Sequence, residues 1–193
     1  MSKRLRLAVE LPGEDLLTAI SSADHLITNY IKQLNPVYLL LGAERNTPLM
    51  GVSPNPGILA CWISRRLKNC GLVIAASLQR DHPYNLARRV ASFDHISKGR
   101  TGILLMAEDH GQSLGLVKRS SWIEEPLSAL AVADGMIAMR KLWRTWPRET
   151  LHANPEISSA AKVRYAVHQG VFSTSGPLNS PTTLQGNLCC FGM

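Results

Sequence analysis

Residues 71–108, GLVIAASLQRDHPYNLARRVASFDHISKGRTGILLMAE, contain two short apolar runs separated by an amphipathic segment. The runs, 71–77 and 101–106, are almost free of charge, as expected of parallel strands that are covered on both faces. Between them, apolar residues recur at intervals of three and four, which is the period of a helix. Pro83 suits a first helical turn and Gly99 suits a left-handed C-terminal cap. The stretch therefore predicts a strand, a helix and a second parallel strand, joined by a right-handed crossover.

The same alternation extends toward the amino terminus. We predict strands at residues 5–11 and 37–42, helices at 14–33 and 58–68, and a loop at 45–57. Strands that alternate with helices at this period indicate a parallel α/β sheet. A closed eight-stranded barrel typically needs about 250 residues, and this chain has 193. We therefore expect one domain, residues 1–193, with a parallel sheet that is too short for the whole ring.

The second half of the chain is less regular. Residues 107–120 are polar and predict a loop at the carboxyl end of the preceding strand, whereas residues 128–143 carry a helical pattern. We expect residues 166–186 to form a short β excursion.

The composition describes a folded chain with an excess of positive charge. Hydrophobic residues make up 45% of the chain and charged residues 18%, with a formal net charge of +7. Such a charge could attract an anionic cofactor, an acidic partner or nucleic acid. The basic residues are scattered, without aromatic interleaving or a zinc motif, so the pattern favours solvated helix faces over a nucleic-acid interface.

The cysteines and the amino terminus indicate a cellular compartment. The four cysteines lack the spacing of a disulfide framework or a metal clamp, which favours a reducing environment. The first residues, MSKRLRLAVELPGED, lack the apolar core of a signal peptide, and no apolar run approaches membrane-spanning length. We therefore expect a cytoplasmic protein that is not inserted in a membrane.

Three segments, in this order, resemble one enzyme family. PYNLARRVASFDHISKGR at 83–100, LWRTW at 142–146 and AVHQGVFSTSGPLNSPTTLQG at 166–186 are similar to motifs of the bacterial-luciferase-like flavin monooxygenases. The resemblance is to the branch that includes nitrilotriacetate and dibenzothiophene-sulfone monooxygenases. The final residues, NLCCFGM, fall where members of this branch have a fifth barrel strand, so the resemblance implies a strand there. The resemblance covers nearly all of this chain but about half of the family's usual length, so the chain looks like a truncated member.

The resemblance implies about the first half of a TIM-type barrel. It also implies a protein that uses reduced FMN, supplied by a separate flavin reductase, and O2 to oxygenate a small organic substrate. Because a barrel enzyme builds its site from loops after all eight strands, a second chain or an oligomer would have to close this barrel. A non-catalytic, degenerate member of the family or a partner protein is the alternative.

Several positions that contact flavin in the family carry other residues here. The family's hydroxyl-rich end of the third strand falls on residues 75–78, where only Ser77 keeps a hydroxyl. Its Trp-Asn pair in the fourth strand falls on Ile103 and Leu104, and its Thr-Ser pair on Ala107 and Glu108. An apolar side chain cannot replace the hydrogen bonds of an asparagine amide. The family's acid after the second strand falls near Ala43, beside Glu44.

Ser77, His82 and Tyr84 are the candidate cofactor-binding residues. Ser77 either contacts an isoalloxazine edge or is satisfied by backbone at the strand end. His82 and Tyr84 flank Pro83 at the carboxyl side of the third strand, within reach of a flavin or substrate, although His82 could also be a surface-loop histidine. No catalytic residue and no metal ligand is predicted.

Four further residues belong to the family motifs and have structural interpretations. His168 precedes Gly170 in a predicted turn, with a ligand role as the alternative. Asp94, His95 and Arg100 are expected to fix the helix to the sheet through hydrogen bonds and helix-end charge.

Other enzyme classes lack support in the sequence. It contains no nucleophile elbow, phosphate-binding P-loop, dinucleotide-binding glycine fingerprint or H-E-x-x-H motif. Ser120, Ser121, Cys189 and Cys190 have no base placed near them by spacing. Flavin chemistry is therefore the one enzymatic function that the sequence indicates.

Overall fold

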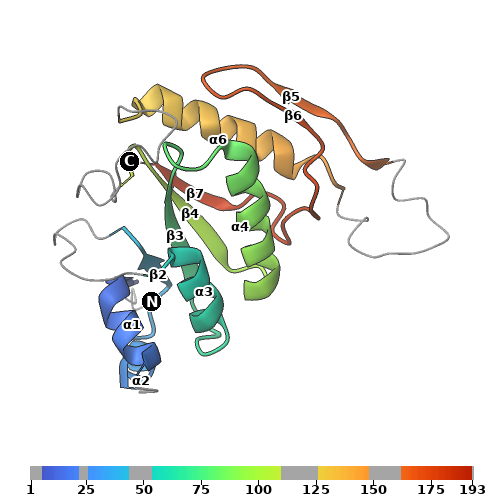
Figure 1. Cartoon of the computed structure of the whole chain (residues 1–193). Helices are drawn as coiled ribbons and strands as arrows, with labels where there is room; N and C mark the ends of the chain where they lie inside the picture. Colours follow the sequence, from blue (N-terminus) through green and yellow to red (C-terminus); the bar gives the residue numbers. More distant parts are fainter. Residues whose placement is uncertain (1–5, 22–25, 44–53, 110–125, 148–161, 193) are drawn as a thin grey trace, which may run out of the picture.

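The computed structural model describes residues 6–21, 26–43, 54–109, 126–147 and 162–192. Within them, one parallel sheet has the strand order β1-β2-β3-β4-β7 (Figure 1). Its strands are β1 (Ala8–Leu11), β2 (Tyr38–Leu41), β3 (Gly71–Ser77), β4 (Thr101–Met106) and β7 (Cys189–Gly192). A separate antiparallel hairpin consists of β5 (Ala166–His168) and β6 (Thr174–Gly176).

The described helices are α1 (Gly13–Ser21), α2 (Leu26–Leu34), α3 (Pro56–Ser64), α4 (Pro83–Ser97) and α6 (Ala129–Trp143). Helices α3, α4 and α6 each begin with a capping side chain that accepts a hydrogen bond from a backbone N–H. The capping residues are Asn55, His82 and Ser128, respectively. Such caps satisfy amide groups that the first helical turn leaves without a partner. Among the described residues, no helix is both long enough and apolar enough to cross a lipid bilayer.

The side chains of the sheet divide into two faces. Leu39, Leu41, Leu72, Ile74, Ile103 and Leu105 belong to a core that also contains side chains of all five described helices. Alternate residues of the same strands form a second cluster of Ala43, Val73, Ala75, Leu104 and Met106, with Tyr38, Leu40 and Phe191 packed against it. We call this second face the inner face, because the described helices pack on the other one (Figure 1).

This arrangement distinguishes a partial barrel from a doubly wound sheet. Each strand lies beside the one that precedes it in the described sheet, and the described helices cover a single face. A doubly wound fold reverses its strand order and carries helices on both faces, whereas a (β/α) barrel does neither. The α/β fold class and the partial TIM-type barrel predicted from the sequence are therefore confirmed.

The stretch that predicts the fold has the structure expected of it. Strands β3 and β4 pair in parallel, with Leu72 opposite Thr101 and Ser77 opposite Met106. Helix α4 begins at Pro83 and ends at Ser97, after which Lys98 and Gly99 both have positive φ, at 60° and 77°. The left-handed cap predicted at Gly99 thus begins one residue earlier, at Lys98.

Two helix predictions were wrong in their bounds. Instead of one helix over 14–33, the structure has α1 ending at Ser21 and α2 beginning at Leu26. The Ser21 hydroxyl donates to the Leu17 carbonyl, and short polar residues of this kind compete with helix continuation. Helix α3 begins at Pro56, inside the predicted loop, because Asn55 caps it, and it ends at Ser64 rather than Lys68. The predicted loop 107–120 lies mostly outside the described residues.

The final strand prediction is confirmed, and the motif residues explain how that strand is held. Trp143 Nε1 donates to the Ala87 carbonyl at 3.0 Å and so joins α6 to α4. The Thr182 hydroxyl donates to the Trp143 carbonyl at 2.6 Å, and the Leu178 N–H donates to the Thr145 hydroxyl. These contacts fix the segment that leads into β7 against the two helices.

Candidate functional site

The carboxyl ends of β3 and β4 bring four polar residues together. Gln79, which is 1% exposed, accepts the Asp109 N–H through Oε1 at 2.7 Å. Asp109 Oδ2 lies 3.1 Å from Arg80 Nε, and Ser77 ends β3 beside them. Because parallel strands end at the same edge, residues that directly follow them in sequence become neighbours. This edge is where a barrel enzyme places its site.

Gln79, Arg80 and Asp109 are residues of this edge that the sequence analysis did not select. All three come within a few residues of the end of a predicted strand. This position in the sequence could have identified them as candidates. Arg80 is half exposed whereas Asp109 is nearly buried, with side-chain exposures of 49% and 9%. The Arg80–Asp109 ion pair joins the loop after β3 to the loop after β4. It places the Arg80 guanidinium, which is half exposed, at the carboxyl edge of the sheet.

Ser77 is buried, and its hydroxyl oxygen accepts the Gln79 N–H at 3.1 Å. From the sequence, Ser77 was expected either to contact the flavin or to bond to backbone at the strand end, and this contact is the second of the two. A hydroxyl oxygen that accepts one hydrogen bond retains its own proton as a donor. Ser77 therefore remains a predicted cofactor contact, now with a defined structural contact beside it.

His82 and Tyr84 make specific intramolecular contacts at the start of α4. His82 Nδ1 accepts the Tyr84 N–H at 3.2 Å, and its ring meets that of Phe172 edge to face at 6.3 Å between centroids. The Tyr84 hydroxyl donates to the Pro177 carbonyl and accepts the Asn179 N–H, each at 3.2 Å. His82 is thus a helix cap rather than an unattached surface histidine. The flavin contacts proposed for both side chains remain predictions.

Leu104 lies on the inner face of β4 and is 5% exposed, beside Val73, Ala75 and Met106. Its neighbour Ile103 lies on the opposite face, in the core beneath the helices. Of the two residues that replace the family's Trp-Asn pair, Leu104 is therefore the one on the inner face, where the amide is expected to lie. Ala43 also belongs to this cluster, whereas Glu44 lies outside the described residues.

Arg100, Asp94 and His95 have the structural roles predicted for them. The Arg100 guanidinium donates to the carbonyls of Ser64, Leu67 and Cys70 at 2.8 to 2.9 Å, and its Nε donates to Ser97. Asp94 is 0% exposed and accepts from Gln185. His95 Nε2 lies 2.8 Å from the Thr182 carbonyl. These contacts hold α4 to its neighbours, which confirms the prediction.

His168 is a buried partner of α6, in agreement with its structural interpretation. Its Nε2 lies 3.0 Å from Asp134 Oδ1, and Asp134 Oδ2 accepts the Phe172 N–H. Burial alone would raise the pKa of Asp134, but the N–H of Phe172 and the His168 side chain oppose it, and the net result is a lowered pKa. A Cβ at Gly170 would lie 2.1 Å from Asp134 Oδ1, so this close approach requires glycine.

Metal and thiol chemistry find little support in the described part of the chain. No group of three or more His, Cys, Asp or Glu side chains that could hold a metal ion occurs among the described residues. Burial raises the pKa of the Cys61, Cys70 and Cys190 thiols. A raised pKa disfavours the thiolate form that a nucleophile requires.

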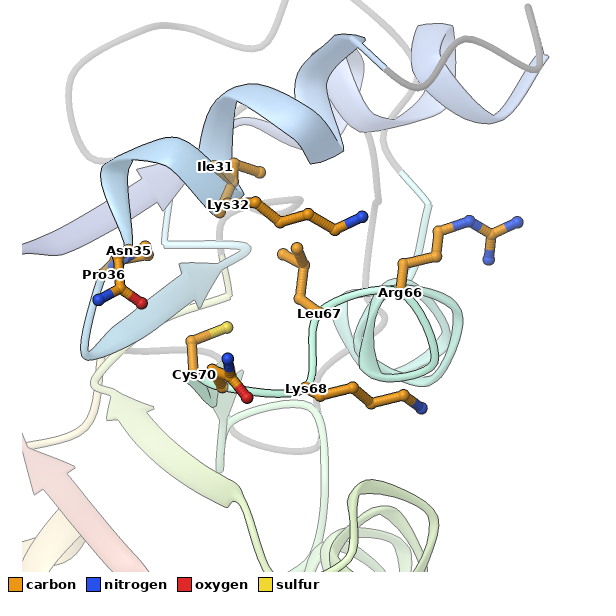
Figure 2. Close-up of a pocket in the computed structure, with 9 residues that line it drawn as sticks. Ile31, Lys32, Asn35, Pro36, Arg66, Leu67, Lys68 and Cys70 are labelled. Carbon is orange, nitrogen blue, oxygen red and sulfur yellow. The ribbon is translucent and has the colours of Figure 1, made fainter.

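A cavity of about 360 Å³ opens at the other end of the sheet (Figure 2). Pro36 and Cys70, which precede β2 and β3, are two of the residues that line it. The cavity is therefore at the amino-terminal edge of the strands and is separate from the candidate site. At about 3.3 Å per strand residue, Cys70 and Ser77 lie about 20 Å apart.

The described residues include an apolar face that suits the flavin ring of FMN, but no cradle for its phosphate. The inner-face cluster around Ala75 and Leu104 has the apolar character that a flavin ring requires, and these two residues are 7% and 5% exposed. The amino end of α4 is occupied by its own cap, since Tyr84 N–H is donated to His82. Among the described ranges, no glycine-rich turn leads from the carboxyl end of a sheet strand into a helix to cradle a phosphate.

The sequence is similar to several monooxygenases, whereas no family model matches the chain. The N-acetyl-S-(2-succino)cysteine monooxygenase of Bacillus subtilis (strain 168) is 27% identical over 135 residues, which is 68% of this chain and 31% of that protein. Component A of the nitrilotriacetate monooxygenase of Aminobacter aminovorans is 27% identical over 149 residues, covering 72% and 32%. The dibenzothiophene-sulfone monooxygenase of Rhodococcus erythropolis is 25% identical over 142 residues, covering 70% and 31%. The matched region is thus about a third of each relative's length.

Solved structures show the same fold over a larger share of the chain. Riboflavin lyase (RcaE), solved with modified FMN and riboflavin, superposes with a TM-score of 0.74 at 22% identity, covering 98% of this chain and 50% of that one. The long-chain alkane monooxygenase LadA superposes with a TM-score of 0.74 at 18% identity, covering 100% and 52%. The chain therefore spans about half of these folds. The chain is therefore similar in sequence to these monooxygenases and has the fold of about half of a luciferase-like enzyme.

Proposed function

We propose that this chain is one domain of a flavin-dependent monooxygenase that uses reduced FMN and O2 to oxygenate a small organic substrate. When bound, reduced FMN would supply the activation of O2 and the transfer of oxygen. This chain would contribute the inner face and the carboxyl-end loops of β3 and β4. The reduced flavin would come from a separate flavin reductase, since the name of one relative, component A of a nitrilotriacetate monooxygenase, indicates an enzyme of more than one component.

The observation that carries this proposal is the inner face of the sheet. Val73, Ala75, Leu104 and Met106 form a buried apolar cluster, and the strands that carry them end at the polar residues Ser77, Gln79 and Asp109. Apolar pockets with a few well-placed polar groups are typical of cofactor sites. A planar ring against the apolar surface would have its polar edge near Ser77, with His82 and Tyr84 on the next helix.

We further propose that another chain, or a second copy of this one, completes the barrel. Strands β1 and β7 are the edges of the described sheet, and unpaired strand edges favour association. Since an FMN phosphate is commonly bound late in a TIM-type barrel, the polypeptide that completes the ring would supply the phosphate contacts.

The test is a titration of the purified chain with FMN, followed by flavin fluorescence, with its mass in solution measured on the same sample. Saturable micromolar binding by a defined oligomer supports the proposal. A monodisperse monomer without FMN affinity contradicts it. Arg66→Gln, which alters the amino-terminal cavity, should leave this FMN binding unchanged if the flavin occupies the carboxyl edge.

A non-catalytic family member or partner protein is the second candidate. It is favoured by Leu104, where an apolar side chain occupies the position of the family's amide. Ser77, His82 and Tyr84 also make intramolecular hydrogen bonds. A folded chain with no flavin affinity and a specific protein partner would select this alternative.

A further inference from the structure

The cavity at the amino-terminal edge combines an apolar floor with a cationic rim. Ile31, Pro36, Leu67 and Cys70 are buried, whereas Lys32, Asn35, Lys68 and Asn69 are exposed and Arg66 is half-buried. None of the nine described residues that line the cavity is acidic. Its volume, about 360 Å³, lies within the range of small-molecule pockets, about 300 to 1,000 Å³.

The rim is formed by two different segments. Figure 2 shows the Lys32 side chain extending from α2 toward the side of the cavity on which Arg66 lies. Arg66 follows the end of α3. Lys68 follows Leu67 on the same connection. Among the described residues, no carboxylate forms an ion pair with Lys32, Arg66 or Lys68. Three of the side chains that line the cavity are therefore cations, and no carboxylate in the described part of the chain pairs with them.

Arg66 is held in a fixed orientation. Its guanidinium carbon lies 3.8 Å from the centroid of the Trp62 ring, and its Nη1 donates to the Trp62 carbonyl at 3.2 Å. Stacking on an aromatic ring and a planar set of donors suit arginine to the recognition of oxyanions. Because the side chain is already ordered, it loses less conformational freedom when it binds a ligand.

The positive charge exceeds what the nearby helix ends require. Cations do stabilise the carboxyl ends of helices, and Lys32 is in the last turn of α2. The carbonyl of Ser64, the last residue of α3, and those of Leu67 and Cys70 beyond it already accept hydrogen bonds from Arg100. The Trp62 carbonyl in the last turn of α3 accepts from Arg66. Lys68 therefore adds charge at a helix end whose carbonyls already have cationic donors.

We propose that this cavity binds a small organic phosphate monoester. A phosphate monoester carries a charge of about −1.5 to −2 at neutral pH and three acceptor oxygens, which matches Arg66 and the two lysines. The organic part would lie on Ile31 and Leu67, with the neutral Cys70 thiol beside it. This site is distinct from the candidate flavin site, because it opens at the opposite edge of the sheet.

Calorimetric titration with phenyl phosphate tests the proposal. We expect saturable binding, a weaker response to inorganic phosphate, which lacks an apolar body, and no binding of benzyl alcohol, which lacks the charge. Arg66→Gln and Lys32→Gln should each weaken phenyl phosphate binding about tenfold or more, since hydrogen bonds to charged groups contribute most to such sites. The matched control Arg88→Gln, on the exposed face of α4, should bind as the unaltered chain does.

Several results would overturn the proposal. These are the absence of saturable phenyl phosphate binding, equal affinity for benzyl alcohol, and equal affinity of Arg66→Gln and Arg88→Gln. If Arg66→Gln does not fold, Lys32→Gln carries the test, because Lys32 is an exposed side chain. FMN is also a phosphate monoester, so a Leu104→Asn variant distinguishes the two sites: it should alter binding at the carboxyl edge and leave phenyl phosphate binding unchanged.

Discussion

Gln185 Nε2 donates a hydrogen bond to Asp94 Oδ1 at 2.7 Å, across 91 positions of sequence. The same nitrogen donates to the Thr101 carbonyl at 2.8 Å, and the Gln185 N–H donates to Asp94 Oδ2. Asp94 is 0% exposed, and a buried carboxylate is tolerated only when donors surround it. One side chain therefore joins the segment before β7 to α4 and to the start of β4.

Gln185→Ala should lower the free energy of unfolding by about 1 to 3 kcal/mol, because it removes a donor from a buried carboxylate. Urea denaturation monitored by far-UV circular dichroism measures the change. Gln33→Ala, an exposed site on α2, is the control and should be close to neutral. Equal stability of the two variants would show that the Asp94 contact contributes little.

Arg100→Lys should be destabilising although it conserves the charge. The guanidinium donates to four carbonyls, and an ammonium group cannot reproduce that geometry. We expect a loss of about 2 kcal/mol or more in the free energy of unfolding. Arg88→Lys, at an exposed position of α4, is the matched control. The same small effect at both positions would refute a structural role specific to Arg100.

The Asp134–His168 contact should make stability depend on pH. The pKa of Asp134 is lowered on folding, so its contribution is present above the ordinary aspartate pKa of about 3.9 and is lost as the pH falls through the lower folded value. Urea unfolding at pH 6 and pH 3 should therefore show a stability gap between the unaltered chain and Asp134→Asn that narrows at pH 3.

The control for this measurement is Asp15→Asn, an exposed position on α1, which should show no gap at either pH. A gap of the same size at pH 6 and pH 3 for Asp134→Asn would mean that ionisation of this carboxyl does not stabilise the hairpin on α6.

Leu104→Asn should tighten FMN binding if β4 lies against the flavin as proposed. The amide restores donors and an acceptor on the inner face, while the loss of a buried leucine should lower stability by about 2 kcal/mol or more. Leu104→Ala is the matched control, since it makes room without adding a hydrogen-bonding group. FMN affinities that rise equally in both variants would attribute the effect to space alone, and unchanged affinity would exclude the placement.

The sequence determined the local elements of this protein. The spacing of apolar residues in 71–108 was sufficient for β3, α4 and β4, because a buried strand and an amphipathic helix each have their own period. Helix bounds were less predictable at α1 and α2, and at α3. At α3, the cap at Asn55 rather than the apolar pattern decided where the helix begins.

The tertiary structure alone decided which residues meet at the ends of the strands. Asp109 reaches Gln79 and Arg80 only because β3 and β4 are adjacent and parallel. The face on which Leu104 lies follows from strand alternation, yet its burial depends on the two neighbouring strands, through Val73 of β3 and Phe191 of β7.

The cationic cavity illustrates the same limit. Lys32 and Arg66 are 34 positions apart and are scattered basic residues when read along the chain. Both line one cavity because α2 and the end of α3 approach the same edge of the sheet. Periodicity is a local property of a chain, whereas a site is a set of distances between separate elements, which only their packing fixes.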